Sequence, residues 1–65
     1  MYIPKSTIKR ILKSAGAGRI SDDALSAFHT SINKFAYDTA SKAVRLAKHA
    51  KRKTVDTSDV KLALN

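Results

Sequence analysis

The spacing of apolar residues along the chain predicts three helices, and the middle helix is much longer than its neighbours. In the first third of the chain, apolar side chains recur at steps of three and four after Pro4. Proline suits the first turn of a helix, because the backbone N–H that it lacks has no helical partner there. Gly16 and Gly18 are typical of a helix end. We therefore predict a first helix over about residues 4–15.

A single amphipathic helix is predicted between Ser21 and Ala50, a stretch without glycine or proline. Ser21 is a favourable N-cap, and the two aspartates after it stand where the helix dipole stabilises negative charge. Together with intervening alanines, the larger apolar residues form one stripe: Leu25, Phe28, Ile32, Phe35, Val44 and Leu46. At about 1.5 Å per residue, such a helix is roughly 45 Å long.

The chain breaks again from Ala50 to Val55, and a short third helix is predicted after the break. Asp56 can cap this helix, with Asp59 in its first turn. Two short helices cannot cover the apolar stripe of the long one, and a helix with an uncovered apolar face is not stable alone. We therefore expect an all-α fold completed by a second copy of the chain, related to the first by a two-fold axis.

The composition is that of one small basic domain, residues 1–65. The chain has no cysteine, so disulfides and thiolate metal sites cannot stabilise it, and oligomerisation is the expected substitute. The formal net charge of +8 favours nucleic acid as the partner, with an anionic membrane surface second. No signal-peptide pattern and no membrane-spanning stretch is present, so we expect a cytoplasmic protein.

The chain lacks the residue patterns on which enzymatic catalysis usually depends. It has no cysteine or glutamate, no pair of carboxylates near a histidine, and no glycine-rich phosphate-binding loop. His29 and His49 are 20 residues apart, and a zinc site needs more ligands than these two. We therefore expect no enzymatic activity, no cofactor and no metal site.

Three segments resemble a known family: AGAGRISDDA (15–24), DTASKAVRLAKHAKRKT (38–54) and DVKLAL (59–64). Together they look like an archaeal-type, tail-less histone over essentially the whole chain. The resemblance implies the histone fold, in which short, long and short helices pair with a second chain as a handshake homodimer. It also implies that the dimer wraps and compacts double-stranded DNA, with paired first-helix N-termini at the centre and paired loops at each end.

Arg19 is the first candidate for a DNA contact. It lies just ahead of the N-terminus of the long helix, and helix N-termini attract phosphates through free N–H groups and the dipole. Histone octamers insert arginines into the minor groove where it faces the protein, and the resemblance implies this role for Arg19. The alternative is an ordinary solvated loop cation.

The second loop contains Lys51, Arg52, Lys53 and Thr54, which are expected to differ in role. By the resemblance, Lys53 and Thr54 match positions that contact phosphates, where lysine supplies a point charge and threonine supplies directed hydrogen bonds. Arg52 resembles the family arginine that pairs with an aspartate seven residues later, here Asp59, and pins the loop to the third helix. Lys51 replaces a common glycine and adds a cation beside the DNA-facing loop.

The first helix adds Lys9, Arg10 and Lys13 on the side opposite its apolar residues, and we expect them to contact DNA. A basic stripe over an apolar one also fits a helix at a membrane surface, but that alternative explains the first helix alone. No element has the row of Asn, Gln and Arg suited to reading bases in the major groove. Binding is therefore expected to be sequence-nonspecific, with DNA bendability setting any preference.

A second interface is implied by the resemblance. Four residues match family positions where two dimers meet in a four-helix bundle: Leu46, His49, Asp59 and Leu62. A hydrogen bond between His49 and Asp59 across this seam would orient and hold it. We therefore expect dimers to assemble further on DNA.

The sequence departs from the family where many relatives carry acidic residues on the outer face of the long helix and on the third helix. These positions hold neutral or basic residues here: Ser14, Asn33, Lys34, Lys42 and Lys61. Salt bridges between stacked dimers are therefore not expected to support long filaments. Histone folds also serve in subunits of transcription-related complexes, so a protein-interaction role beside a different chain is the alternative function.

Overall fold

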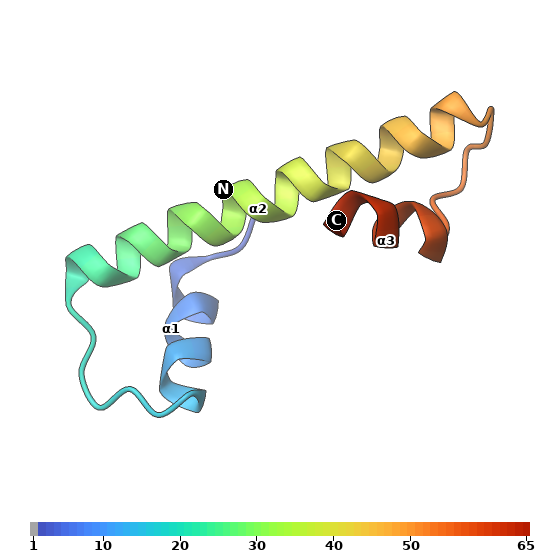
Figure 1. Ribbon diagram of the computed structural model, residues 1–65. Helices are drawn as coiled ribbons and strands as arrows, with labels where there is room; N and C mark the ends of the chain where they lie inside the picture. Colours follow the sequence, from blue (N-terminus) through green and yellow to red (C-terminus); the bar gives the residue numbers. More distant parts are fainter. Residues whose placement is uncertain (1) are drawn as a thin grey trace. The chain divides into compact units, whose positions relative to one another are not determined.

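A computed structural model describes residues 2–65 of the protein, and within that range it contains three helices and no strand. The helices are α1 (Lys5–Ser14), α2 (Asp22–His49) and α3 (Thr57–Leu64), labelled in Figure 1. The all-α fold predicted from the sequence, with a short, a long and a short helix, is confirmed.

The first helix is one residue shorter at each end than predicted. Pro4 is the N-cap and not a helical residue, because its backbone is extended, with φ −72° and ψ 155°. Its carbonyl oxygen accepts hydrogen bonds from the backbone N–H groups of Thr7 and Ile8 at 3.1 and 3.3 Å. Ala15 is the C-cap. Pro4 therefore starts α1 as a hydrogen-bond acceptor. The N–H group that proline lacks would have no partner in the helix at this position.

The chain divides within α2 into two compact units, one up to Lys34 and the other over residues 35–65, which are described in turn. In the first unit, the side chain of Ile8 is completely buried. Ser21 caps α2 as predicted, since its Oγ accepts a hydrogen bond from the backbone N–H of Ala24 at 3.1 Å. That residues 1–65 form a single domain stays a prediction.

In the second unit, α3 lies alongside the last part of α2 (Figure 1). The apolar residues buried in this unit are alanines: Ala43 and Ala47 on α2 and Ala63 on α3. Small side chains allow two helices to approach closely, because the interaxial distance depends on the side chains at the contact. At the start of α3, the backbone N–H of Asp56 donates to Asp59 Oδ2 at 2.8 Å.

Large apolar side chains remain exposed in both units. The exposed fraction is 48% for Ile11, 59% for Phe35, 60% for Leu62 and 54% for Leu64. Among the described residues, Ile8 is the one large side chain with almost no exposure. A single chain thus buries too little apolar surface for a stable core of its own, which favours a partner chain. No helix within residues 2–65 is both long and apolar enough to cross a lipid bilayer.

Candidate nucleic-acid interface

Arg52 and Asp59 form a bidentate ion pair that joins the second loop, residues 50–56, to α3. The guanidinium donates from Nη2 to Asp59 Oδ1 at 2.8 Å and from Nη1 to Asp59 Oδ2 at 2.9 Å. The planar fork of arginine matches the two oxygens of a carboxylate. Asp59 is only 3% exposed, so this carboxylate is covered by protein and not by solvent. The structure therefore brings together the two residues that the sequence predicted as a structural pair.

The hydrogen bonds of this pair favour the charged forms of both groups. Donation from Arg52, and then from the backbone N–H of Asp56, holds the pKa of Asp59 below its ordinary value of 3.8, against the opposing effect of burial. The hydrogen bond to Asp59 likewise raises the pKa of Arg52 above its ordinary value. Both side chains are therefore charged at neutral pH.

The same guanidinium organises the rest of the second loop. Arg52 Nη1 also donates to the carbonyl oxygen of Thr54 and to Asp56 Oδ2, each at 3.1 Å. Lys51 and Lys53 are exposed, and within residues 2–65 neither side chain has a hydrogen bond or an ion pair. The three adjacent cations therefore divide into one structural arginine and two solvent-facing lysines. The side chain of Thr54 is exposed beside them.

The helices that precede the two loops, α1 and α2, end in the same hydrogen-bonded turn. After α1, the N–H groups of Gly16 and Ala17 donate back to carbonyl groups of the last turn at 3.0 and 3.1 Å. After α2, the N–H groups of Lys51 and Arg52 do so at 2.9 Å. This Schellman motif needs one residue with positive φ, which is 108° at Gly16 and 60° at Lys51. The left-handed conformation costs a residue with a Cβ atom roughly 1–2 kcal/mol, so Lys51 adds its charge at the expense of stability.

The cations predicted to bind DNA from the first unit are also exposed. Arg19 lies two residues before the Ser21 cap, and no hydrogen bond or ion pair within residues 2–65 holds its side chain. Lys9 is exposed too, and its side chain has no hydrogen bond or ion pair within residues 2–65. Arg10 and Lys13 have only long contacts of 3.5 Å, one with a threonine hydroxyl and one with a backbone carbonyl. Contacts of this length are weak, so all four cations are available to an external anion.

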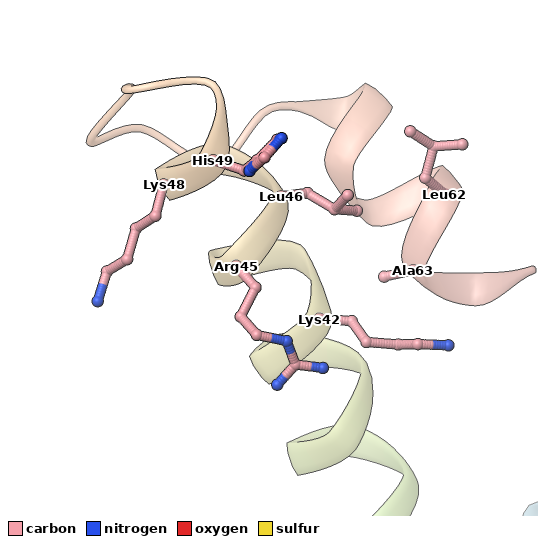
Figure 2. A pocket seen from close by; sticks show the side chains of 7 residues that line it. All are labelled: Lys42, Arg45, Leu46, Lys48, His49, Leu62 and Ala63. Carbon is pink, nitrogen blue, oxygen red and sulfur yellow. The ribbon is translucent and has the colours of Figure 1, made fainter.

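Three of the four residues predicted at a dimer–dimer interface line one open groove of about 790 Å³ between the end of α2 and α3 (Figure 2). They are Leu46, His49 and Leu62. The fourth, Asp59, does not line the groove, and its carboxylate already accepts hydrogen bonds from Arg52 and from a backbone N–H. If His49 of another copy donated a hydrogen bond to Asp59, the carboxylate would have to accept it in addition to the bonds from Arg52 and the Asp56 N–H.

The position of Asn33 corrects one expectation, because this residue is buried and does not lie on the outer face of α2. It is only 3% exposed. Its Oδ1 accepts from the backbone N–H of Ile3 at 2.7 Å, and its Nδ2 donates to the Ile3 carbonyl at 3.2 Å and to the His29 carbonyl at 2.8 Å. His29 Nε2 lies 2.7 Å from the same Ile3 carbonyl, and it must be the donor because a carbonyl only accepts. We call this arrangement of His29, Asn33 and the Ile3 backbone the N-terminal clamp.

The N-terminal clamp was not predicted from the sequence, although one signal was present. His29 and Asn33 are four residues apart, so they share one helix face and lie beside the apolar stripe. Their partner, however, is the main chain of residue 3, and no side-chain pattern identifies a main-chain partner. Within residues 2–65, no group of three or more histidine, cysteine or acidic side chains is placed to hold a metal ion.

These observations define a protein of the histone-fold class. A family model described as "Histone-like transcription factor (CBF/NF-Y) and archaeal histone" matches residues 1–64, and the chain belongs to this family. It is 50% identical over 62 residues to "Probable archaeal histone 3" of Methanocaldococcus jannaschii, which covers 95% of this chain and 92% of that protein. It is 40% identical over 62 residues to an archaeal histone HAN1 subunit of Thermococcus zilligii, again over 95% of this chain and 92% of that protein. The predicted resemblance to archaeal-type histones is confirmed.

Proposed function

We propose that this protein is a minimal histone that binds double-stranded DNA without sequence specificity and wraps or compacts it in the nucleoid. The observation that carries the proposal is the division of the second-loop cations. Arg52 is tied to Asp59, whereas Lys51 and Lys53 face solvent without partners within residues 2–65. A loop held by an internal ion pair presents its remaining cations at fixed positions, which suits the regular spacing of phosphates.

Homodimerisation would cover the apolar surface that a single chain exposes, including Phe35 and Leu64. One loop precedes α2 in the chain and the other follows it. An antiparallel pair of α2 helices would therefore place the first loop of one chain beside the second loop of its partner. Arg19 would then share a DNA-binding surface with the second-loop residues of the other chain, and the α1 cations would form a further surface.

The proposed contacts with phosphates make affinity depend on salt far more than on sequence. Arg19→Ala and Lys53→Ala should each weaken binding to all DNA sequences alike. Lys53→Ala should also reduce the slope of log affinity against log salt by about 0.9 for each phosphate contact that the substitution removes. Lys61→Ala is the matched control, since it removes an exposed α3 cation outside both loops. An equal change in the control, or unchanged affinity in both loop variants, would contradict these assignments.

Nuclease digestion of protein–DNA complexes tests whether the DNA is wrapped. A discrete protected length is expected if each assembly binds a counted length of DNA. A ladder of protected lengths would indicate growth by stacking of further dimers. A continuous smear would mean that the protein coats DNA without wrapping it.

Further assembly of dimers on DNA is proposed at the groove that contains Leu46, His49 and Leu62. Chemical crosslinking of the parent and of His49→Ala on DNA tests the part played by the histidine. The variant is expected to give fewer products larger than a dimer. Identical crosslinking ladders would remove His49 from the interface.

A protein-interaction role beside a different histone-fold chain is the second candidate, because the matched family also includes histone-like transcription factors. Light scattering of the purified chain separates the two candidates. A folded homodimer favours the DNA-binding histone, since it needs no other chain. An unfolded monomer points to a missing partner, which would have to cover the exposed apolar residues instead.

A further inference from the structure

An open hollow of about 610 Å³ lies in the first unit, between the start of α1 and the early turns of α2. We call it the Lys5 hollow, and the residues that line it are Pro4, Lys5, Ser26, His29 and Thr30. The three α2 residues follow at steps of three and four, so they share one face of the helix. Four of the five lining side chains can donate a hydrogen bond, and among the described residues that line the hollow none is acidic. Such a lining suits an anion and not an apolar molecule.

The donors around the Lys5 hollow are largely unused within the first unit. Lys5 Nζ donates to Ser26 Oγ at 3.3 Å, a long and exposed bond that leaves the other ammonium hydrogens free. Ser26 accepts this bond, so its own hydroxyl hydrogen remains available. Within residues 2–34, the hydroxyl group of Thr30 has no hydrogen bond. Three side chains therefore bring free donors to one place, and one of them is charged.

His29 adds a ring nitrogen whose role follows from the N-terminal clamp. Its Nε2 carries a hydrogen, because it donates to the Ile3 carbonyl at 2.7 Å. In the neutral ring, Nδ1 is then an acceptor, and no partner for it is present within residues 2–34. In the described part of the chain, no fully buried side-chain nitrogen or oxygen lacks a partner. The unpartnered Nδ1 therefore reaches solvent, at the hollow that His29 lines.

Positive charge faces His29 across the hollow, from Lys5 on α1. Among the described residues before α1, the titratable side chain is that of Tyr2, which is 72% exposed. Asp22 in the first turn of α2 and Lys9 on α1 do not line the hollow. A proton on Nδ1 would therefore place a second cation beside Lys5 without a carboxylate between them. An anion in the hollow would offset this repulsion, so the anion and the proton favour each other's binding.

We propose that the Lys5 hollow binds a tetrahedral oxyanion such as a phosphate group, and that His29 takes up a proton on Nδ1 as the anion binds. Lys5 and the protonated ring supply positive charge. The hydroxyl groups of Ser26 and Thr30 add directed hydrogen bonds. The proton comes from solvent, and Nε2 keeps its bond to the Ile3 carbonyl. Because the hollow is open, it admits a free anion or a phosphate that belongs to a DNA strand.

The Lys5 hollow is separate from the DNA contacts proposed above. The residues that line it include none of the cations to which those contacts were assigned. A free anion in the hollow goes beyond the proposed function. A DNA phosphate in the hollow rests on the proposed function, and it would make DNA binding tighten as the pH falls.

Sulfate without DNA is the probe, because it resembles phosphate in shape and stays a dianion at the pH values used. Titrations are followed through the amide shifts of Ser26 and Thr30 in NMR spectra, at about pH 6 and about pH 8. We expect saturable binding that is roughly tenfold tighter at the lower pH. His29→Gln keeps a donor for the Ile3 carbonyl but lacks the second ring nitrogen, so its sulfate affinity should not depend on pH in this range.

Lys5→Ala should weaken sulfate binding at both pH values, because it removes a positive charge from the hollow. Lys61→Ala is the matched control, since it removes an exposed α3 cation that does not line the hollow. The Ser26 and Thr30 amides of this control should respond to sulfate as they do in the parent. Circular dichroism shows whether each variant is folded. If one is not, the pH dependence and the saturation of the parent's own shifts still decide the outcome.

A DNA duplex distinguishes the two sources of the anion. If a DNA phosphate occupies the hollow, sulfate should no longer shift the Ser26 and Thr30 amides of the complex. The DNA affinity of His29→Gln should then depend less on pH than that of the parent. If the hollow takes a free anion, sulfate should still bind to the complex, and the two proteins should bind DNA with the same pH dependence.

Three outcomes of the titrations without DNA would overturn the proposal. Amides of Ser26 and Thr30 that do not respond to sulfate, or respond without saturation, would mean that the hollow is not a binding site. Equal affinity of the parent at both pH values would exclude proton uptake by His29. Equal affinities of Lys5→Ala and Lys61→Ala would show that net charge alone attracts sulfate. None of these outcomes involves DNA, so the DNA-binding proposal is left to its own salt and nuclease tests.

Discussion

Each unit holds a short segment in place with polar side chains, but the first unit uses hydrogen bonds to the main chain and the second uses an ion pair. In the first unit, Asn33 and His29 hold the main chain of Ile3 through hydrogen bonds. In the second unit, Arg52 and Asp59 hold the loop and α3 through a bidentate ion pair. A buried amide satisfies its partners without a charge, whereas loss of either member of an ion pair leaves the other charge uncompensated.

The ion pair suits the unit in which it occurs. Lys51, Arg52 and Lys53 are adjacent in the chain, and three neighbouring positive charges repel one another. Asp59 neutralises the middle one and turns it inward. The loop therefore presents two lysines to solvent while Arg52 holds its backbone. The N-terminal segment carries no such run of charge, and hydrogen bonds to its main chain are sufficient there.

The largest expected effect is that of Asp59→Asn. This change keeps the shape of the side chain but removes the charge that Arg52 pairs with and one of its two acceptor oxygens. We expect a greater fall in Tm than for any of the substitutions described below, measured by thermal unfolding followed by circular dichroism. Asp56→Asn is the control, because asparagine is an equally favourable N-cap for α3 and the change otherwise weakens one exposed contact of Arg52. A fall no larger than that of the control would mean that the ion pair does not hold the unit together.

Acid should weaken the second unit through the same carboxylate. Because its pKa is lowered in the folded protein, Asp59 contributes stability that is fully present above its ordinary value of 3.8 and is lost as the pH falls through the folded-state pKa. Arg52 has a raised pKa and keeps its charge throughout this range. Urea unfolding between about pH 2 and 5 should show a steeper loss for the parent than for Asp59→Asn. Parallel profiles for the two proteins would exclude this carboxylate as the cause.

Replacement of Asn33 by aspartate introduces a charge into the first unit, whereas Asp59→Asn removes one from the second. Asn33→Asp keeps an acceptor for the Ile3 N–H but places a carboxylate against the carbonyl oxygens of Ile3 and His29, which both lose the Nδ2 donor. We expect a loss of about 1–3 kcal/mol at neutral pH, measured by urea unfolding, with part of it recovered in acid as the carboxyl gains a proton. Asn33→Ala is the control, because it removes the same hydrogen bonds without the introduction of a carboxyl group. Hydrogen exchange should show the Ile3 amide unprotected in Asn33→Ala, and retained protection there would argue against the clamp.

The smallest expected effect concerns Lys51, which follows α2 and has a left-handed backbone conformation. Lys51→Gly should stabilise the protein by about 1 kcal/mol, because glycine adopts positive φ without steric cost. The same change should weaken DNA binding, since it removes a solvent-facing cation. Gly16→Ala is the opposite case at the end of α1, where φ is 108°, and it should lower the Tm. If Lys51→Gly leaves both stability and affinity unchanged, the lysine neither strains the loop nor binds DNA.

The helices, the N-caps of α2 and α3 and the basic character of the protein were predictable from the sequence, because these properties are local. Apolar spacing located all three helices, and Ser21 identified the start of α2 within one residue. The family resemblance was also readable from three short segments. The spacing of Arg52 and Asp59 indicated a structural pair before any geometry was known, although only the tertiary structure shows that Asp59 is buried beneath its partner.

The tertiary structure decided what the local pattern could not. Asn33 was expected on an outer face, yet the path of the N-terminal segment buries it against the Ile3 main chain. Asp59 was expected both to pair with Arg52 and to meet another dimer, and the structure shows the first of these contacts within one chain. The groove at Leu46 exists only where α3 packs beside α2. Periodicity reports which residues share a face of one helix, whereas partners from distant segments depend on how the chain returns to that face.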